Sequence, residues 1–458
     1  MIDGLKPYAE YKDSGSGWLG AVPKKWEVRN LRTLISKRTE RDRPDLPLLS
    51  VAREKGVFIR SMTDADENHN VIPDDLTNYK VARAGNLVIN KMKAWQGSMG
   101  IAPCDGIVSP AYFVFDFRIA NRAFGQSLLR SKPYVAHFGQ ASDGVRVGQW
   151  DLSISGMRQI PVLVPSDDEQ ASIVRFLDHA NRKIDGFIRA KRKLIGLLNE
   201  QKQAIIHSAV TRGLDPKVPL KPSGIPWLGD IPEHWEAKRI KYLLREVDNR
   251  STTGLEPLLS MRMHHGLVVF SEHFTRPPQA ATLVGFKIVR PRQFVVNRMQ
   301  AGNGVIFSSC LSITGLVSPD YAVFDPIADV NVDYLGELFR SRMLRVKFRS
   351  ESKGLGTGTS GFMRLYNDRF GAIHIPLPSR KEQDSILKGI EEQSADLNTA
   401  IARTEREITL MQEYRTRLAA DIVTGKLDVR EAAAKLPEVE PEPASNAPLE
   451  DLETEENE

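Results

Sequence analysis

The feature that most limits what this chain can fold into is an internal repeat. Trp18–Glu27 (WLGAVPKKWE) recurs as Trp227–Glu236 (WLGDIPEHWE), 209 residues later. Further matches follow in the same order, at offsets between 207 and 213 residues: Pro47–Ser50 with Pro257–Ser260, Asn90–Met92 with Asn297–Met299, Gly106–Pro110 with Gly315–Pro319, Pro165–Gln170 with Pro378–Gln383, and Val210–Asp215 with Val423–Asp428. Two units of about 210 residues are too few and too long for a solenoid, and each can build its own core. The repeat therefore predicts two related domains in a pseudo-two-fold arrangement.

Composition places the 458-residue chain among globular proteins, with 41% hydrophobic and 26% charged residues. No run of about 18 apolar residues exists for a membrane span, and the first residues lack the apolar core of a secretory signal. Its two cysteines, Cys104 and Cys310, are too few for a disulfide framework or a four-cysteine zinc site. We expect a cytoplasmic protein.

The charge is unevenly distributed. Residues 431–458 carry ten acidic side chains and one lysine, a net −9, which leaves +14 for the remainder of a chain whose total is +5. A body this basic favours a polyanionic partner, although many other soluble proteins reach such a value. The acidic, proline-containing segment 427–458 is predicted to be disordered.

Each repeat is predicted to end in one long helix. Ser166–Glu169 and Ser379–Glu382 have the capping-box pattern, and Gly213 and Gly425 are typical stop signals. Apolar residues spaced alternately by three and four predict a narrow seam. The predicted members of the seam are Ile173, Leu177, Ile184, Leu194, Leu198 and Ile205, and then Ile386, Ile390, Leu397, Ile401, Ile408, Met411, Leu418 and Ile422. We expect these helices to pair as an antiparallel coiled coil; the alternative packs each helix only on its own domain.

The remaining segments are predicted to be mixed α/β. Apolar runs such as Tyr112–Phe115 and Gln293–Val296 are typical of strands, and short helical patterns at Phe124–Leu129 and Tyr334–Phe339 lie between them. The predicted fold class is α/β, with two duplicated domains separated by the two long helices. The predicted boundaries are 1–165 for the N-terminal segment and first domain, 166–213 for the central helix, 214–225 for a linker, 226–378 for the second domain, 379–426 for the C-terminal helix and 427–458 for the tail.

A search for catalytic motifs finds no convincing site. Gly15–Gly20 and Gly356–Gly361 both match GxGxxG, but neither follows an apolar strand and no phosphate-binding lysine motif follows. The second is better explained as a flexible loop that, with its flanking basic residues, could close over a phosphate backbone. The histidines lack companions at metal-ligand spacing, so we predict no metal site and no enzyme activity in this chain.

Taken together, the motifs resemble those of the specificity subunits of type I restriction-modification systems. The resemblance rests on the Trp-Leu-Gly-x-Ile/Val-Pro-x-x-Trp-Glu opening, Asn-Lys/Arg-Met followed by Val-Ser-Pro, the Pro-Ser-x-x-Glu-Gln entry to each helix and the Val-Thr-x-x-Leu-Asp exit. It spans residues 17 to about 430. Each motif is modest alone, but the same order twice makes the set specific.

The resemblance implies two target-recognition domains, each reading one half of a bipartite, asymmetric DNA site. It also implies that the long helices form the spacer and a platform for two methyltransferase subunits, joined by two restriction-translocase subunits. The implied chemistry belongs to these partners, which use S-adenosylmethionine, ATP and Mg. The present chain would bind double-stranded DNA and no cofactor.

Comparison of the two copies gives candidate DNA-binding residues. Positions that agree, such as Asn90 with Asn297 and Lys91 with Arg298, are expected to support the fold or contact phosphates, whereas positions that differ can read bases. Trp95 is equally compatible with a stacking residue and a core residue. The candidates are Arg53, Lys55, Arg60, Asn90, Lys91, Lys93, Trp95, Gln96, Arg146, Arg262, His264, Asn297, Arg298, Gln300, Asn303, Lys353 and Arg364; solvated surface charge is the alternative for the basic ones.

Three other functions stay open at this point. One is a specificity subunit of a related system outside type I, with a combined methylase-nuclease partner. A second is a two-lobed coiled-coil scaffold for proteins alone, and a third is an active methyltransferase. Salt-sensitive binding to duplex DNA would exclude the scaffold, and methyl transfer by the purified chain would be needed to support the third.

Overall fold

The computed structural model describes residues 5–60, 75–144, 150–262, 266–274, 277–304, 306–308, 311–355 and 362–437. Its contacts divide the chain into unit 1, Met1–Ala190 with Glu407–Glu458, and unit 2, Lys191–Arg406. The division falls inside both long helices, α5 (Asp167–Arg212) and α10 (Arg380–Val423). Each unit therefore holds one globular part and one portion of each long helix.

The elements of unit 1 besides these helices are β1 (Tyr11–Asp13), β2 (Ala21–Pro23), β3 (Glu27–Asn30), α1 (Leu31–Leu34), β4 (Ile35–Arg38), β5 (Leu49–Ala52), β6 (Gly56–Ile59), β7 (Lys80–Ala82), β8 (Leu87–Asn90), η1 (Ala94–Gln96), β9 (Met99–Ile101), β10 (Gly106–Val108), β11 (Tyr112–Phe117), α2 (Arg122–Leu129), α3 (Lys132–Gln140), β12 (Ser142–Asp143), β13 (Asp151–Leu152), α4 (Ile154–Arg158), β14 (Pro161–Val164) and α11 (Arg430–Ala434).

Unit 2 follows the same order, except that η2 stands in place of α1 and α6 is added after β20. Its elements are β15 (Leu220–Pro222), β16 (Asp230–Pro232), β17 (Glu236–Arg239), η2 (Ile240–Tyr242), β18 (Leu244–Val247), β19 (Leu259–Arg262), β20 (Gly266–Val269), α6 (Phe270–His273), β21 (Lys287–Val289), β22 (Phe294–Val296), η3 (Ala301–Asn303), β23 (Ile306–Ser308), β24 (Gly315–Val317), β25 (Ala322–Pro326), α7 (Val332–Arg340), α8 (Arg342–Glu351), β26 (Lys353–Leu355), β27 (Phe362–Arg364), α9 (Asn367–Ala372) and β28 (His374–Leu377).

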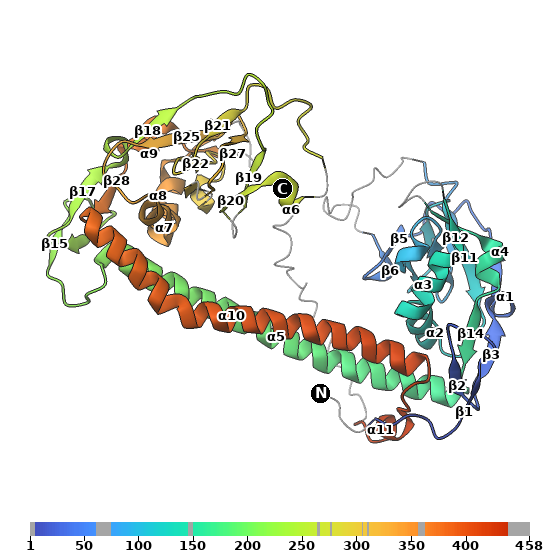
Figure 1. The fold of residues 1–458 in the computed structure, drawn as a ribbon. Helices are drawn as coiled ribbons and strands as arrows, with labels where there is room; N and C mark the ends of the chain where they lie inside the picture. The colour runs from blue at the N-terminus through green and yellow to red at the C-terminus, as the bar shows by residue number, and fades with distance from the viewer. Residues whose placement is uncertain are drawn as a thin grey trace. The chain divides into compact units, whose positions relative to one another are not determined.

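Each unit is built on a four-stranded antiparallel sheet, ordered β4-β11-β8-β9 in unit 1 and β18-β25-β22-β23 in unit 2 (Figure 1). Alternate side chains enter two different cores, because successive residues of a strand point to opposite faces. Leu87 and Ile89 of β8 join the core that contains α2 and α3, whereas Val88 joins a smaller core with β5 and β6. Phe294 and Val295 divide in the same way in unit 2. The sheets are buried on both faces, which confirms the mixed α/β prediction.

The Glu-Gln pair at the start of each long helix ties that helix to its globular part. In unit 1 the Oε1 of Gln170 accepts the N–H of Asn121, the N-cap residue of α2, at 3.0 Å, and its Nε2 donates to the oxygen of Pro165 at 2.9 Å. Gln383 makes the same two bonds in unit 2, to Asn331 at 2.8 Å and Pro378 at 2.9 Å. Both glutamines are 1% exposed, so the motif has a structural role.

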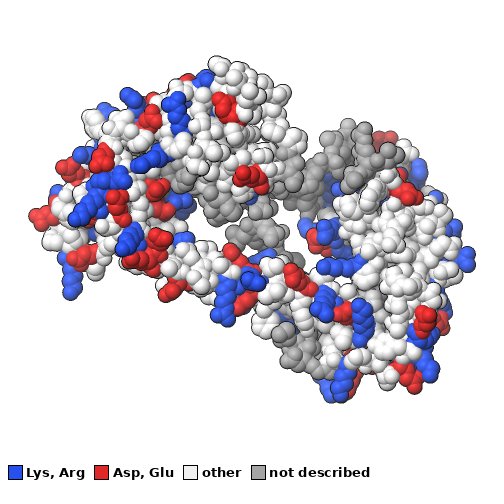
Figure 2. Space-filling model, in the orientation of Figure 1, with Lys and Arg blue, Asp and Glu red and all other residues white. Residues whose placement is uncertain are grey.

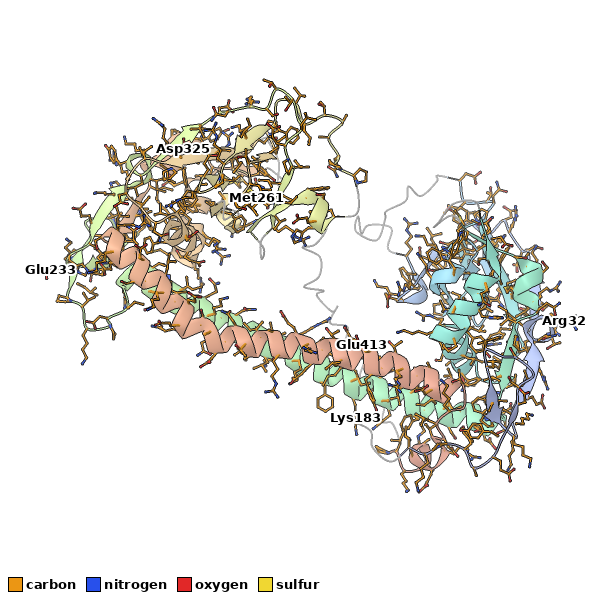
Figure 3. All side chains as sticks on the ribbon, in the orientation of Figure 1. Arg32, Lys183, Glu233, Met261, Asp325 and Glu413 are labelled. Atoms are coloured by element: carbon orange, nitrogen blue, oxygen red, sulfur yellow. The ribbon has the colours of Figure 1, made fainter. Side chains whose placement is uncertain are left out.

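The two long helices pack together antiparallel (Figure 1). In unit 1 the first turns of α5 share a core with the last turns of α10, through Ile173, Leu177 and Ile422. In unit 2 the end of α5 meets the start of α10 through Val210 and Ile386. Lys183 on α5 and Glu413 on α10, labelled in Figure 3, are exposed and lie outside this seam. The predicted pairing of the helices is confirmed.

The seam of α5 departs from the predicted register beyond Ile184. Burial continues through Ile188, with two successive steps of four residues from Ala180, a stutter in the heptad pattern. Ile195 and Leu198 are then half-buried. The prediction for Leu194 is wrong. After the stutter the seam continues through Ile195, so Leu194 faces away from α10 and is 41% exposed. The alternating spacing predicted from the sequence also places Phe187, three residues after Ile184, in the seam, but Phe187 is 57% exposed.

The seam of α10 keeps its heptad spacing by burying two polar residues. Ser394 and Thr404 fill the positions between Ile390 and Leu397 and between Ile401 and Ile408. Each hydroxyl donates to a carbonyl oxygen four residues earlier in the helix, so neither is left without a hydrogen bond. The sequence pattern did not include them because it counted only apolar side chains.

The predicted linker and the predicted tail each contribute residues to a unit. β15 lies in the predicted linker 214–225 and pairs with β16, as β1 pairs with β2 in unit 1. In the predicted tail 427–458, Val429 and Ala433 are buried in the core of unit 1, and the N–H of Asp428 donates to the oxygen of Lys6 at 2.8 Å. The prediction of disorder is wrong for residues 427–437; residues 438–458 lie outside the described part of the chain.

Candidate nucleic-acid interface

The segment that joins β8 to β9 in unit 1 and the segment that joins β22 to β23 in unit 2 have the same turn structure. In unit 1 the Oδ1 of Asn90 accepts the N–H of Met92 at 3.1 Å, and in unit 2 Asn297 accepts the N–H of Met299 at 3.1 Å. A 3-10 turn follows, η1 or η3, and each ends at a left-handed glycine, Gly97 or Gly304. The candidates Asn90 and Asn297 therefore shape this turn, as expected for positions at which the copies agree.

A short hairpin docks on this connection in each unit. The N–H of Leu152 donates to the oxygen of Lys91 at 2.9 Å, and the N–H of Leu365 donates to the oxygen of Arg298 at 2.9 Å. The hairpins are β12–β13 in unit 1, where Asp143 pairs with Asp151, and β26–β27 in unit 2, where Lys353 pairs with Arg364. The structure thus brings Arg298, Lys353 and Arg364 together, although they are far apart in the sequence.

The charged side chains at this contact differ between the units. Lys91 forms an ion pair with Asp151 in unit 1, with 2.7 Å between Nζ and Oδ2. In unit 2 the Nε of Arg298 donates to the backbone oxygen of Asp320 at 3.1 Å. Burial, followed by the charge of Arg364, lowers the pKa of the Arg298 guanidinium below its ordinary value.

Arg364 itself is incompletely satisfied. Its Nε is buried and has no hydrogen-bond partner among the described residues. Its guanidinium carbon lies 5.7 Å from the centre of the Tyr366 ring, which is within the range of a cation–π contact. The side chain is therefore held over an aromatic ring with donor capacity left over.

The side chains that differ between the copies sit on the two 3-10 turns. Trp95 is half-buried: its Nε1 donates to the oxygen of Met92 at 3.1 Å, and its ring centre lies 5.2 Å from that of Trp150. These two contacts anchor the Trp95 side chain in unit 1. Asn303 is exposed, and its Oδ1 accepts a hydrogen bond from Arg349 at 2.8 Å. Of the other candidates here, Lys93 is exposed, and Gln96 and Gln300 are half-buried.

A second group of candidates lies on the β5–β6 hairpin of unit 1. Arg130 fixes the turn, since its Nη2 donates to the backbone oxygens of Arg53 and Glu54 at 2.6 and 2.8 Å. The side chain of Arg53 pairs with Glu54 at 3.4 Å, and the Nζ of Lys55 lies 5.3 Å from the centre of the Phe58 ring. Figure 2 shows lysine and arginine side chains gathered at the edge of unit 1 where this hairpin lies.

The remaining candidates are less informative. Arg60 is half-exposed, and Arg262 on β19 lies over the ring of Phe274 at 5.2 Å. Arg146, His264 and the glycine loop 356–361 lie outside the described residues. Within the described residues, no three His, Cys, Asp or Glu side chains gather in a way that could hold a metal ion. No described helix is both long and apolar enough to cross a membrane.

Several residues of this site were missed by the sequence analysis. Asp143, Trp150 and Asp151 lie outside the motifs that match between the copies. Extending the alignment of the two Pro-Ser-x-x-Glu-Gln motifs backward at an offset of 213 places Asp151 opposite Arg364. Arg130 and Arg349 gave no signal, because each acts through a contact with a distant loop.

Comparisons with known proteins were made for the whole chain. A search of protein-family models finds no match. Among curated proteins, the “Putative type I restriction enzyme MjaX specificity subunit” of Methanocaldococcus jannaschii is 20% identical over 444 residues, which cover 90% of this chain and 96% of the relative. The chain is similar to type I specificity subunits. This agreement confirms the resemblance that the repeated motifs predict.

Two solved structures were also compared with this chain. A chain from a study of complex assembly and conformational transition in a type I restriction-modification system matches with a TM-score of 0.56 at 13% identity, covering 89% of this chain and 99% of that one. The HsdS subunit from Thermoanaerobacter tengcongensis matches with a TM-score of 0.40 at 14% identity, covering 89% and 98%. The first of these shows a shared fold.

Proposed function

We propose that this chain is the non-catalytic, sequence-specific DNA-binding subunit of a type I restriction-modification system. The observation that carries the proposal is one backbone framework, present twice, with different side chains on its connecting turns. Gln96 in unit 1 stands where Asn303 stands in unit 2, on turns closed by equivalent left-handed glycines. Such an arrangement suits two readers of unlike DNA half-sites, because the framework fixes position and the varied side chains select bases.

The partners that this function requires are two methyltransferase subunits, two restriction-translocase subunits and double-stranded DNA, in the cytoplasm. We assign S-adenosylmethionine, ATP and Mg to the partner subunits. The paired helices α5 and α10 would set the spacing between half-sites and form the platform on which the methyltransferases bind.

The surface of unit 2 offers a place for such a partner. Leu194 and Leu197 of α5 are 41% and 53% exposed. Close by on the same helix begins a groove of about 1180 Å³ between α5 and α8, lined by Ala204, Trp227 and Val346 among others. Exposed apolar side chains beside a groove are typical of surfaces that receive a helix of another protein.

The methylation pattern of the host genome tests this function. We expect a split adenine-methylated motif in cells that carry the gene, its loss when the gene is deleted, and its return when the gene is restored. An unchanged set of methylated adenines after deletion would reject the proposal. The scaffold alternative predicts the same unchanged pattern, together with no salt-dependent binding of duplex DNA by the complex.

A further inference from the structure

The hairpins that dock on the two connecting turns have inverted charges. Two hydrogen bonds establish which residues are equivalent: Ser142 and Ser352 donate to the oxygens of Phe138 and Phe348, at 2.8 Å in both cases. The residues that follow them, Asp143 and Lys353, therefore occupy the same position. Each is paired across its hairpin, Asp143 with Asp151 and Lys353 with Arg364.

Like charges directly opposite one another in a strand pair are unfavourable. Unit 1 relieves this repulsion within itself, because Lys91 forms its ion pair with Asp151. In unit 2 the corresponding residue is Arg298, another cation. Lys91, Asp143 and Asp151 of unit 1 therefore carry a net charge of −1. The residues at the same three positions of unit 2, Arg298, Lys353 and Arg364, carry +3.

Within the described part of unit 2, Arg298, Lys353 and Arg364 form no ion pair. Two of the nearby acids have other partners, since Glu351 pairs with Lys347 and Asp248 with Arg250. The residues of unit 2 outside the description, 263–265, 275–276, 305, 309–310 and 356–361, contain no Asp or Glu. The negative charges of Glu246, Asp320 and Asp248 raise the pKa of Arg298, which favours its charged form. Burial and the charge of Arg364 nevertheless lower this pKa overall.

We infer that Arg298, Lys353 and Arg364 form a phosphate-binding site of unit 2, which holds the DNA backbone beside its half-site, and that unit 1 has no such contact at the equivalent place. This inference rests on the proposed function and adds to it a difference between the two readers. A phosphate supplies the missing counter-charge, and its oxygens can accept hydrogen bonds from the terminal N–H groups of the two arginines, whose planar guanidinium suits phosphate oxygens. Unit 2 thus contributes more of the salt-dependent binding than unit 1.

The experiment exchanges the charge patterns of the two hairpins. The first variant, Lys353→Asp with Arg364→Asp, gives unit 2 the acidic pair that already folds in unit 1. The second, Asp143→Lys with Asp151→Arg, gives unit 1 the basic pair. The control, Lys238→Asp with Lys241→Asp, makes the same net change at two exposed lysines of unit 2. Binding of a random-sequence 30-base-pair duplex is measured against salt for the full chain in complex with its methyltransferase partner.

For the first variant, we expect the slope of log Kd against log salt concentration to fall by about one to two. Binding near 100 mM salt should weaken roughly tenfold. The second variant should steepen the plot by about one, a gain that misfolding cannot produce. Equal changes in the first variant and the control would overturn the site, because net charge alone would then explain them. An unchanged slope in the first variant would overturn it too. A wild-type complex without salt-dependent binding would instead reject the proposed function.

Discussion

Trp235 of unit 2 donates its indole N–H to Glu382 at 2.9 Å, whereas the equivalent Trp26 of unit 1 has no hydrogen-bond partner among the described residues. The glutamate of unit 1, Glu169, is buried, and its Oε1 lies 3.9 Å from the Nε of Arg430, which belongs to the C-terminal segment. Both glutamates begin a long helix in the same motif. The same motif therefore makes different contacts in the two units, because the segments around Tyr8 and Arg430 pack only on unit 1.

The proposed DNA-binding surfaces of the two units show the same separation between conserved backbone contacts and differing side chains. The turn at Asn90 and the turn at Asn297 have matching hydrogen bonds, yet the hairpins beside them have opposite charges. After duplication, the backbone contacts were kept because the fold needs them, and the side chains facing outward were free to diverge. Function is then expected to lie in the differences between the units and stability in their agreements.

The largest effects should come from changes to what the units share. Ile173 and Ile386 are 0% and 1% exposed at equivalent positions, so we expect Ile173→Ala and Ile386→Ala to destabilise their units by similar amounts, about 2–4 kcal/mol each. Urea unfolding followed by peptide-level hydrogen exchange measures both. Phe187→Ala is the control, since this exposed side chain should cost less than about 0.5 kcal/mol. A large effect of Phe187→Ala would restore the register predicted from the sequence.

The next effects concern positions at which the copies differ. Gln96→Ala should relax base selectivity in one half-site, and Asn303→Ala in the other, each by about 1–3 kcal/mol of discrimination at one base pair. Competition binding with duplexes substituted in one half-site at a time measures this. If either variant weakens binding to all sequences equally, its residue contacts phosphate and the assignment to base reading is wrong.

A smaller difference is expected at the two helix entries. Trp235→Phe removes a donor from Glu382, whereas Trp26→Phe removes an N–H that has no described partner. The first change should therefore destabilise the protein by about 1–2 kcal/mol more than the second. Thermal unfolding of both variants checks this difference, and equal losses would show that the bond to Glu382 contributes nothing measurable.

The smallest effect is expected for Lys91. Lys91→Ala should weaken binding to all DNA sequences and reduce the slope of log Kd against log salt concentration. The reduction should be smaller than for Arg298→Ala, for which we expect the slope to fall by about one. The reason is that Lys91 already shares its charge with Asp151. Salt titrations of the two complexes compare the slopes, and a steeper loss for Lys91→Ala would reverse the order that we infer for the units.

Much of this could be predicted from the sequence. The repeated motifs predicted two equivalent domains, the capping and stop signals placed the long helices at 166–213 and 379–426 against 167–212 and 380–423 in the structure, and the family resemblance followed from motif order. These features are local, because helix ends, turn glycines and strand alternation depend on neighbouring residues. The seam beyond Ile184 was mispredicted because apolar residues lie on both sides of the stutter.

Local sequence patterns were enough to show a duplicated α/β chain with one long helix per repeat. Three outcomes came from the three-dimensional packing alone: which apolar residues of α5 face α10, that residues 427–437 complete the core of unit 1, and that Asp151 neutralises Lys91 while Arg364 adds to the charge of Arg298. The physical reason is distance along the chain: each of these outcomes depends on a contact between residues separated by sixty positions or more, and no local pattern records such a partner.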